Sequence, residues 1–270
     1  MQTQNAAAAF RALHHGSEVL LLPNAWDAAS AAIFRQLGAR AIATTSAGLA
    51  WSCGFADGDV LPGEDLLGAV RRIRRVIADL PLSIDIEGGY SDDPQAVADL
   101  VERLVELGVA GINIEDGGRD ASLLAAKVEA IAARSRAKGN DVFVNARCDV
   151  YLRELASGDD AVRETVARGK AYAAAGAGGL FVPGLDDVQA MAAIARDVAI
   201  PLAIFAVPGL PPANELFAAG VRRLSAGESL AALAFGTARE AAAAFLRDGD
   251  SSVVLTARNL DYGPTNALFT

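Results

Sequence analysis

The chain has 270 residues, of which 52% are hydrophobic and 21% are charged, and its formal net charge is -9. This length and composition suit one globular domain with a single large core. The acidic balance excludes nucleic acid and anionic membrane as expected partners. Two cysteines, Cys53 and Cys148, give no disulfide framework, and no signal-peptide pattern or membrane-spanning run occurs. We therefore expect a cytoplasmic protein.

Short apolar runs predict eight β-strands, and most are followed by a segment with helical spacing of its apolar residues. In chain order these strands span residues 19–23, 41–45, 82–87, 111–115, 142–147, 179–183, 201–205 and 222–225. The alternation predicts an α/β fold, a (β/α)8 barrel of the TIM type. An open doubly wound sheet is the alternative fold, but no Gly-x-Gly-x-x-Gly turn follows the first strand.

The C-terminal segment is longer than barrel closure requires. Residues 227–248 form an alanine-rich helical stretch, and residues 251–270 follow without a strand. We treat residues 1–270 as one barrel domain in which residues 227–270 are a C-terminal helical segment. That segment either packs across the bottom of its own barrel or reaches a neighbouring subunit.

Acidic residues stand at the ends of successive predicted strands. Buried parallel strands are nearly continuous Val, Ile and Leu, so carboxylates are expected only where a strand emerges. In a barrel these carboxyl ends meet on one face. Asp85 and Glu87 share one face of their strand and would repel each other without a cation, and Glu115 adds a third acid. We predict a site for Mg²⁺, or Mn²⁺, held by Asp85, Glu87 and Glu115.

The residue types that are missing exclude several chemistries. The only histidines are His14 and His15, before the first strand, so a histidine-based zinc site and a Ser-His-Asp triad are not expected. The only lysines are Lys127, Lys138 and Lys170, and none closes a predicted strand, which argues against a Schiff-base aldolase.

Three further features have two interpretations each. Small residues at the end of the second strand, Thr45 to Gly48, form either an ordinary turn or a nest whose N–H groups and hydroxyls bind a carboxylate. Asp57 stands beside glycine and is either a turn residue or a functional acid. Arg147 is either an ion-pair partner of the acids or a bidentate clamp on a substrate carboxylate.

Five ordered motifs together resemble the isocitrate lyase/phosphoenolpyruvate mutase superfamily. They are PNAWDAAS (residues 23–30), TSAG (45–48), DIEGGY (85–90), GINIED (111–116) and NARCD (145–149). The resemblance implies a (β/α)8 barrel whose last helix is swapped between subunits of a homodimer or homotetramer. It also implies a small 2-oxo acid as substrate, such as pyruvate, oxaloacetate or glyoxylate, processed through an enolate held on Mg²⁺.

The resemblance also assigns roles to individual positions. The family's carboxylate-binding loop corresponds to Ser46, Ala47 and Gly48, next to Thr45, and its loop aspartate corresponds to Asp57. Its Mg²⁺ shell corresponds to Asp85, Glu87 and Glu115. Asp85 is implied to be a direct ligand that also contacts the substrate, and Glu87 and Glu115 are implied to act either directly or through water. Its substrate-binding arginine corresponds to Arg147, so the implied catalytic residues are Asp57, Glu115 and Arg147.

One departure from the family limits the reaction. True lyases carry a mobile loop after the fourth strand with a catalytic cysteine, whereas this chain has DGGRDAS (residues 116–122) and no cysteine there. The same loop lacks the lysine and asparagine of a mutase. The expected reaction is therefore C–C cleavage by an oxaloacetate decarboxylase-like enzyme or a related lyase. The alternatives are a carbon–heteroatom hydrolase, with Asp57 or Glu115 activating water, and a non-catalytic 2-oxo acid binding protein.

Overall fold

The computed structural model describes residues 2–256 and 259–269, with side chains from Ala6 onward. Its centre is one sheet of parallel strands in the order β1-β9-β8-β7-β6-β5-β4-β3-β2. The strands are β1 (Leu20–Leu22), β2 (Asn24–Ala25), β3 (Ile42–Thr44), β4 (Leu82–Asp85), β5 (Gly111–Glu115), β6 (Phe143–Arg147), β7 (Gly179–Phe181), β8 (Leu202–Phe205) and β9 (Val221–Ser225).

The sheet closes on itself through Pro23. β1 pairs with β9, β2 pairs with β3, and only Pro23 separates β1 from β2. Proline has no N–H to donate to a ladder, so it interrupts what is otherwise one strand. Counted this way, the eight predicted strands are all present, and the predicted (β/α)8 fold is confirmed. The first strand continues to Ala25, two residues beyond its predicted end.

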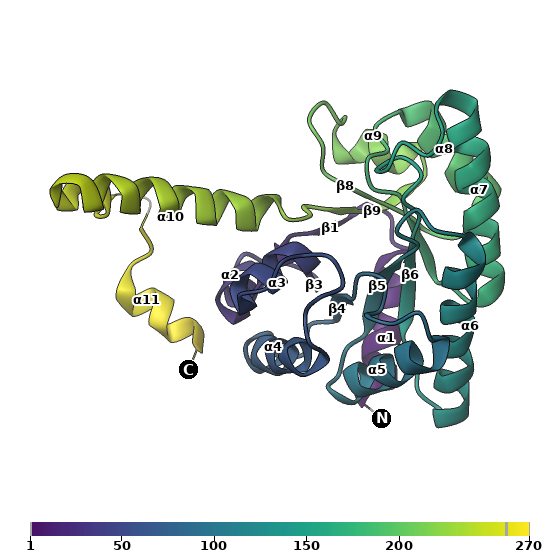
Figure 1. Ribbon diagram of the computed structural model, residues 1–270, viewed down its shortest axis with the longest axis horizontal. Coiled ribbons are helices and arrows are strands. Elements are labelled where there is room, and N and C mark those ends of the chain that lie inside the picture. The colour runs from purple at the N-terminus through teal and green to yellow at the C-terminus, as the bar shows by residue number, and fades with distance from the viewer. Residues whose placement is uncertain (1, 257–258, 270) are drawn as a thin grey trace.

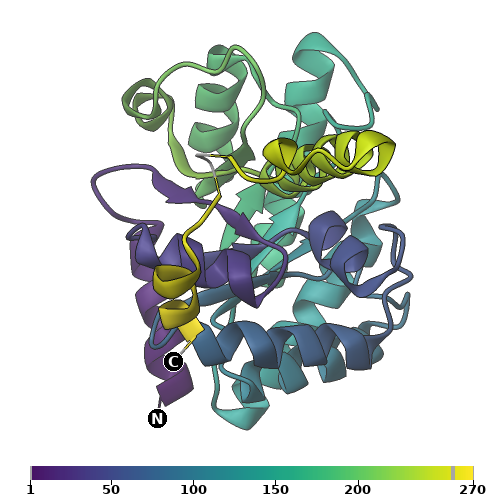
Figure 2. The ribbon, with the colours of Figure 1, turned by 90° about the vertical axis from the view of Figure 1, so that its left-hand side faces the viewer.

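Helices surround the barrel, as Figures 1 and 2 show. Helix α1 (Gln2–Leu13) precedes the first strand. The outer helices are α2 (Ala28–Gln36), α3 (Ser46–Cys53), α4 (Gly63–Val76), α5 (Pro94–Glu106), α6 (Ala121–Lys138), α7 (Gly158–Ala175), α8 (Val188–Val198) and α9 (Ala213–Ala218). The C-terminal part contains α10 (Ser229–Asp248), the 3-10 turn η1 (Ser251–Val253), α11 (Tyr262–Asn266) and the 3-10 turn η2 (Ala267–Phe269).

Helix α5 illustrates how the sequence specifies an outer helix. The Asp93 carboxylate accepts a hydrogen bond from the Gln95 N–H, and proline occupies the first turn, where its missing N–H costs nothing. Val97, Val101 and Leu104 recur at helical spacing and are buried against the sheet. Full burial of such a side chain contributes about 1.5–3 kcal/mol, so this apolar stripe holds the helix on the barrel.

Helix α1 closes the amino-terminal end of the barrel with aromatic side chains. Phe10 and Phe143 pack edge to face with ring centroids 5.5 Å apart, and His14 stacks on Phe143 at 4.2 Å. Gly111 allows this approach, because a Cβ there would lie 2.7 Å from the Phe10 ring. The His14 Nδ1 lies 2.8 Å from the Phe10 carbonyl oxygen. This layer seals the end of the barrel opposite the acidic strand ends.

His14 should make the protein lose stability in acid. Burial, helped by the charge of Arg223, lowers the His14 pKa from 6.5 to about 3. Between these values the unfolded chain binds a proton that the folded chain does not, so stability falls as the pH falls, by about 1.4 kcal/mol per pH unit. We expect His14→Leu to remove about 2 kcal/mol of the loss between pH 7 and pH 5, measured by urea unfolding. His15→Leu, at an exposed neighbour, serves as the control substitution, and an unchanged slope in His14→Leu would contradict this origin.

Helix α10 leaves the barrel as a long arm instead of packing across its bottom (Figure 1). Ala231 is its one buried residue within the described part of the chain, whereas Leu233 and Leu246 are 66% and 82% exposed. Phe235 makes edge contacts with Trp26 and Trp51 near the start of the arm. Residues 257–258 and 270 of the predicted C-terminal segment lie outside the described residues.

None of the helices in the described ranges has the length and apolar character needed to cross a bilayer. The cytoplasmic location stays a prediction.

Candidate active site

A cavity of about 400 Å³ lies at the carboxyl ends of the strands. It brings together most of the residues predicted from the sequence, and its walls come from strands β2 to β9 and the loops that follow them. Its walls are formed by Asn24, Thr44, Thr45, Ser46, Ala47, Trp51, Asp57, Asp85, Asn113, Arg147, Leu152, Phe181, Pro183, Phe205, Ser225, Gly227 and Glu228. Glu87 and Glu115 are not among them, so the three predicted metal ligands do not face the cavity together.

The predicted carboxylate-binding segment is the amino terminus of a helix. Thr45 is the N-cap of α3, and its side chain makes no capping hydrogen bond. The first N–H groups of a helix have no partner within the helix, so those of Ser46, Ala47 and Gly48 are free to bind an anion. Gly48 is needed for packing, because a Cβ there would lie 2.8–3.0 Å from Thr45, Trp26 and Ala231. The helix dipole adds a partial positive charge at this point.

Polar side chains cross the barrel interior as a row on three neighbouring strands. Asp85 on β4, Asn113 on β5 and Asn145 on β6 are in register. The Asn113 Nδ2 donates to the Asp85 carboxylate at 3.1 Å, and the Asn145 Nδ2 donates to the Asn113 Oδ1 at 2.9 Å. The other Asp85 oxygen accepts from the Glu87 N–H at 3.1 Å. The row fixes the Asp85 carboxylate beneath the cavity.

Burial disfavours the charged form of the Asp85 carboxylate. Desolvation raises its pKa, and Asp57 acts in the same direction, while Arg147 and the Asn113 hydrogen bond oppose the shift. A buried carboxylate whose charged form is disfavoured gains most from a cation placed beside it.

Arg147 sits between two carboxylates. Its Nη1 lies 2.6 Å from Glu115, and its Nε lies 2.6 Å from Asp149. Desolvation, with the neighbouring Asp85 and Asp149, raises the Glu115 pKa to about 8, despite the opposing effect of Arg147. The structure therefore shows Arg147 as an ion-pair partner of Glu115 and Asp149. Because Arg147 also lines the cavity, the clamp interpretation stays a prediction for the bound state.

Glu87 turns away from the cavity toward the loop that carries Asp57. One of its carboxylate oxygens accepts the N–H groups of Gly58, at 2.8 Å, and Asp59. The other oxygen is buried without a hydrogen-bond partner in the described structure. Desolvation raises the Glu87 pKa, and Asp57 and Asp59 add to that effect. Its role as a metal ligand stays a prediction.

The cavity residues fit a magnesium site of the kind that keeps several waters. Among the described residues, no three His, Cys, Asp or Glu side chains come close enough together to enclose a metal by themselves. Mg²⁺, however, usually takes one or two carboxylates and fills its remaining positions with water or substrate oxygens. Asp85, an oxygen donor with a buried and poorly compensated charge, is the residue that would hold it, with Asp57 at the cavity wall.

Asp116, which follows the predicted ligand Glu115, has a structural role. Its carboxylate accepts hydrogen bonds from the Tyr172 hydroxyl at 2.7 Å and Arg168 at 3.0 Å, and from two backbone N–H groups, of Gly118 and Asp149. Both carboxylate oxygens are thereby satisfied in a buried position. Asp116 ties the loop after β5 to helix α7 and to the end of β6.

Asp116→Ala should destabilise the fold strongly. It would leave the Tyr172 hydroxyl without its acceptor and would take from the nearly buried Arg168 guanidinium one of its two carboxylate partners, while Glu164 stays in place. Removing one partner of a buried ion pair costs about 3–5 kcal/mol. Urea unfolding measures this free energy. Asp120→Ala, in the same loop at an exposed helix cap, should destabilise the fold far less. Equal losses in the two variants would show that Asp116 does not organise the loop.

The loop after β5 is short and held at both ends. Arg119 pairs with Asp92 at 2.6 Å, and its N–H donates to the Asp116 carbonyl at 2.9 Å.

Cys148 is a packing residue and not a catalytic acid, because burial raises the pKa of its thiol to about 12.

The sequence interpretation missed several residues of the site. Asn24 accepts the N–H groups of Ala226 and Gly227 and so links the first strand to the loop before α10. Asn113 and Asn145 were also missed, although asparagine inside an otherwise apolar strand was the available signal. Arg223, fully buried in the barrel, has Nε and Nη1 without partners in the described structure, and burial lowers its pKa to about 10.

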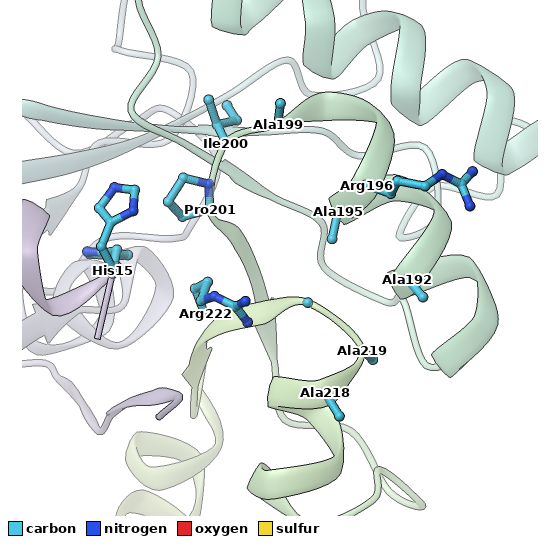
Figure 3. Close-up of a pocket in the computed structure, with 12 residues that line it drawn as sticks. His15, Ala192, Ala195, Arg196, Ala199, Ile200, Pro201, Ala218, Ala219 and Arg222 are labelled. Carbon is cyan, nitrogen blue, oxygen red and sulfur yellow. The ribbon is translucent and has the colours of Figure 1, made fainter. Parts of the chain in front are cut away.

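A second cavity, of about 420 Å³, opens at the opposite end of the barrel (Figure 3). His15, Arg196 and Arg222 lie around an apolar floor that includes Pro201. No carboxylate and no residue of the predicted site lines it. Because the acids, the helix terminus and Arg147 all belong to the other end, the chemistry is assigned there.

The sequence matches the phosphoenolpyruvate phosphomutase family over residues 10–246. It is 30% identical over 214 residues to 2-methylisocitrate lyase of Escherichia coli, covering 75% of this chain and 70% of that one. It is 31% identical over 156 residues to oxaloacetate decarboxylase of a Marinomonas strain, covering 56% and 54%. The crystal structure of 2,3-dimethylmalate lyase superposes with a TM-score of 0.84 at 26% identity, covering 97% of this chain and 94% of that one.

The fold and the acidic mouth of the barrel therefore define an enzyme of the lyase and mutase class. More particularly, the chain belongs to the isocitrate lyase/phosphoenolpyruvate mutase superfamily, as its motifs indicated.

Proposed function

We propose that the chain is a Mg²⁺-dependent carbon–carbon lyase of a small 2-oxo acid, and that oxaloacetate decarboxylation fits it best. The proposal rests on one observation: the α3 amino terminus, Arg147 and the Asp85 carboxylate all line the same cavity. Two positive elements suit a substrate with two carboxylates, and the acidic group suits a cation between them. The similarity to an oxaloacetate decarboxylase supports this choice.

Decarboxylation needs few catalytic groups. The C3–C4 bond of oxaloacetate breaks and C4 leaves as carbon dioxide. The electron pair of that bond moves toward the C2 oxygen, and the resulting enolate takes a proton at C3 to give pyruvate. A bound divalent cation would supply a Lewis acid for the negative charge that develops at the C2 oxygen. The free N–H groups of Ser46 to Gly48 would orient one carboxylate, and Arg147 would orient the other. Asp57, an exposed carboxyl at the cavity wall, would deliver the proton from solvent.

The short loop after β5 favours this reaction over isocitrate cleavage or phosphoryl transfer. Its anchors, Arg119 with Asp92 and Asp116 with Arg168, give it little freedom to close over a substrate. A phosphoryl or glyoxylate-releasing reaction benefits from a closed, water-free site. An open site still supports decarboxylation, because the enolate that forms there is to be protonated.

A panel of 2-oxo acids with Mg²⁺ or Mn²⁺ tests the proposal, read by pyruvate formation. We expect oxaloacetate to be turned over, with loss of activity when EDTA is added. Release of phosphate from phosphonopyruvate without oxaloacetate turnover would instead identify a carbon–heteroatom hydrolase. Ligand-induced thermal stabilisation with no turnover of any compound would identify a binding protein.

We also infer that helix α10 packs on a neighbouring subunit in a homodimer or homotetramer. Its exposed apolar residues include Leu233, Phe235, Phe245 and Leu246, which a lone barrel would leave in water. The full-length chain should remain oligomeric at low micromolar concentration in light scattering. Removing residues 227–270 should give insoluble or unfolded protein, and Phe245→Glu should dissociate a folded oligomer. A folded full-length monomer would refute the assembly.

A further inference from the structure

Two loops at the mouth of the barrel hold each other through exchanged carboxylates. The loop between α3 and α4 carries Asp59, whose Oδ1 accepts the N–H groups of Gly88 at 3.0 Å and Tyr90 at 3.1 Å. The turn after β4 carries Glu87, whose Oε2 accepts the N–H groups of Gly58 and Asp59. Each loop therefore donates two backbone N–H groups to the side chain of the other.

The backbone of both loops needs this support. Asp59, Glu87 and Tyr90 have φ values of +59°, +52° and +58°, in the left-handed region that side chains other than glycine rarely adopt. Such conformations persist only where the surroundings hold them. Gly88 provides the necessary space, because a Cβ there would lie 2.6 Å from the Asp59 Oδ2.

A buried lysine fixes the same turn from the other side. The Lys127 ammonium, on helix α6 and 1% exposed, donates to the Gly88 carbonyl oxygen at 2.8 Å. It also lies 3.7 Å from Asp92, which pairs with Arg119. The peptide groups on the two sides of Gly88 are thus held by Asp59 at the N–H and by Lys127 at the carbonyl. The turn is anchored to the barrel, and the exchanged carboxylates extend that anchor to the Asp57 loop.

We propose that Asp59 and Glu87 are positioning residues that form a reciprocal clamp, which holds Asp57 at the cavity. Asp57 directly precedes the two N–H groups that Glu87 binds, and it lines the cavity with Asp85, whereas Glu87 does not. The inference rests on the proposed function only in giving Asp57 a role toward the substrate.

Four substitutions separate the clamp from other roles. Glu87→Gln and Asp59→Asn keep a carbonyl oxygen that can accept the same N–H groups, whereas Glu87→Ala and Asp59→Ala remove it. Asp65→Ala, at an exposed acid in the first turn of α4, is a control for loss of nearby charge. The measurements are Mn²⁺ affinity by electron paramagnetic resonance, kcat and KM with oxaloacetate, and hydrogen exchange of single amides.

We expect both alanine variants to lose about 10²-fold in kcat through misplacement of Asp57. Asp59→Ala should keep the wild-type KM and Mn²⁺ affinity, and Asp59→Asn should restore kcat. Glu87→Gln should keep the amide protection that Glu87→Ala loses. Weakened Mn²⁺ binding in Asp59→Ala, or a lowered melting temperature with unchanged kcat in the alanine variants, would overturn the proposal.

Hydrogen exchange tests the clamp even if oxaloacetate is not a substrate. In Asp59→Ala the amides of Gly88 and Tyr90 should exchange at least about ten-fold faster, and in Glu87→Ala those of Gly58 and Asp59 should do so. The exchange rates of the α7 amides should not change in either alanine variant. In the Asp65→Ala protein, the four amides of the clamp should exchange as they do in the wild type. Normal protection in the alanine variants would refute the clamp, whereas absence of turnover with lost protection would refute only the proposed reaction.

Discussion

Replacing Asp85 by alanine is expected to abolish both the metal response and the activity while the barrel stays folded. Asp85 is the buried carboxylate of the cavity, and none of the described residues forms a salt bridge with it. Wild-type protein should gain about 2.7 kcal/mol of stability at a Mg²⁺ concentration of 100 times Kd, and Asp85→Ala should gain none. Thermal unfolding with and without Mg²⁺ measures this difference.

Asp92→Ala is a suitable control for the Asp85 variant. Asp92 is an acid of the neighbouring loop that pairs with Arg119 and does not line the cavity. The Asp92→Ala protein should be stabilised by Mg²⁺ as much as the wild type is. A metal response in Asp85→Ala equal to that of the wild type would show that the cation binds elsewhere.

Arg147→Lys is expected to weaken substrate binding although the charge is unchanged. The guanidinium contacts Glu115 through Nη1 and Asp149 through Nε and Nη2, a geometry that one ammonium group cannot reproduce. Loss of one charged hydrogen bond costs about 1.5–3 kcal/mol, so KM for oxaloacetate should rise about 10- to 100-fold.

Arg153→Lys is the matched control, because Arg153 also contacts Asp149 but is half exposed. It should change KM little. If Arg147→Lys lowers only the free energy of unfolding and leaves KM normal, Arg147 is solely an ion-pair partner of Glu115 and Asp149.

Strand positions could be predicted because buried parallel strands are uniformly apolar and leave a clear signal. The carboxyl ends of those strands also placed Asp85 and Arg147 correctly at one mouth. The break at Pro23 was not predicted, since Asn24 and Ala25 give too short a run to be recognised as a strand. The pairing of Asn24 and Ala25 with β3 depends on closure of the barrel, which is a long-range property of the fold.

Side-chain directions at the mouth could not be predicted from strand periodicity. Alternation places Asp85 and Glu87 on one face of a regular strand. However, β4 ends at Asp85, and Glu87 has a positive φ that turns it toward the Asp57 loop. The role of Asp116 depends on Arg168 and Tyr172, more than fifty residues later in the chain, which no local pattern connects to it.

Calorimetric titration with oxalate tests the central claim most directly, because oxalate is a planar dianion that resembles the enolate of pyruvate. If the cavity binds a 2-oxo acid together with a cation at Asp85, oxalate should bind wild-type protein only when Mg²⁺ is present. Binding should disappear in Asp85→Ala and weaken in Arg147→Lys. Equal oxalate binding in EDTA, or normal binding by Asp85→Ala, would contradict a metal-assisted 2-oxo acid site at the mouth of this barrel.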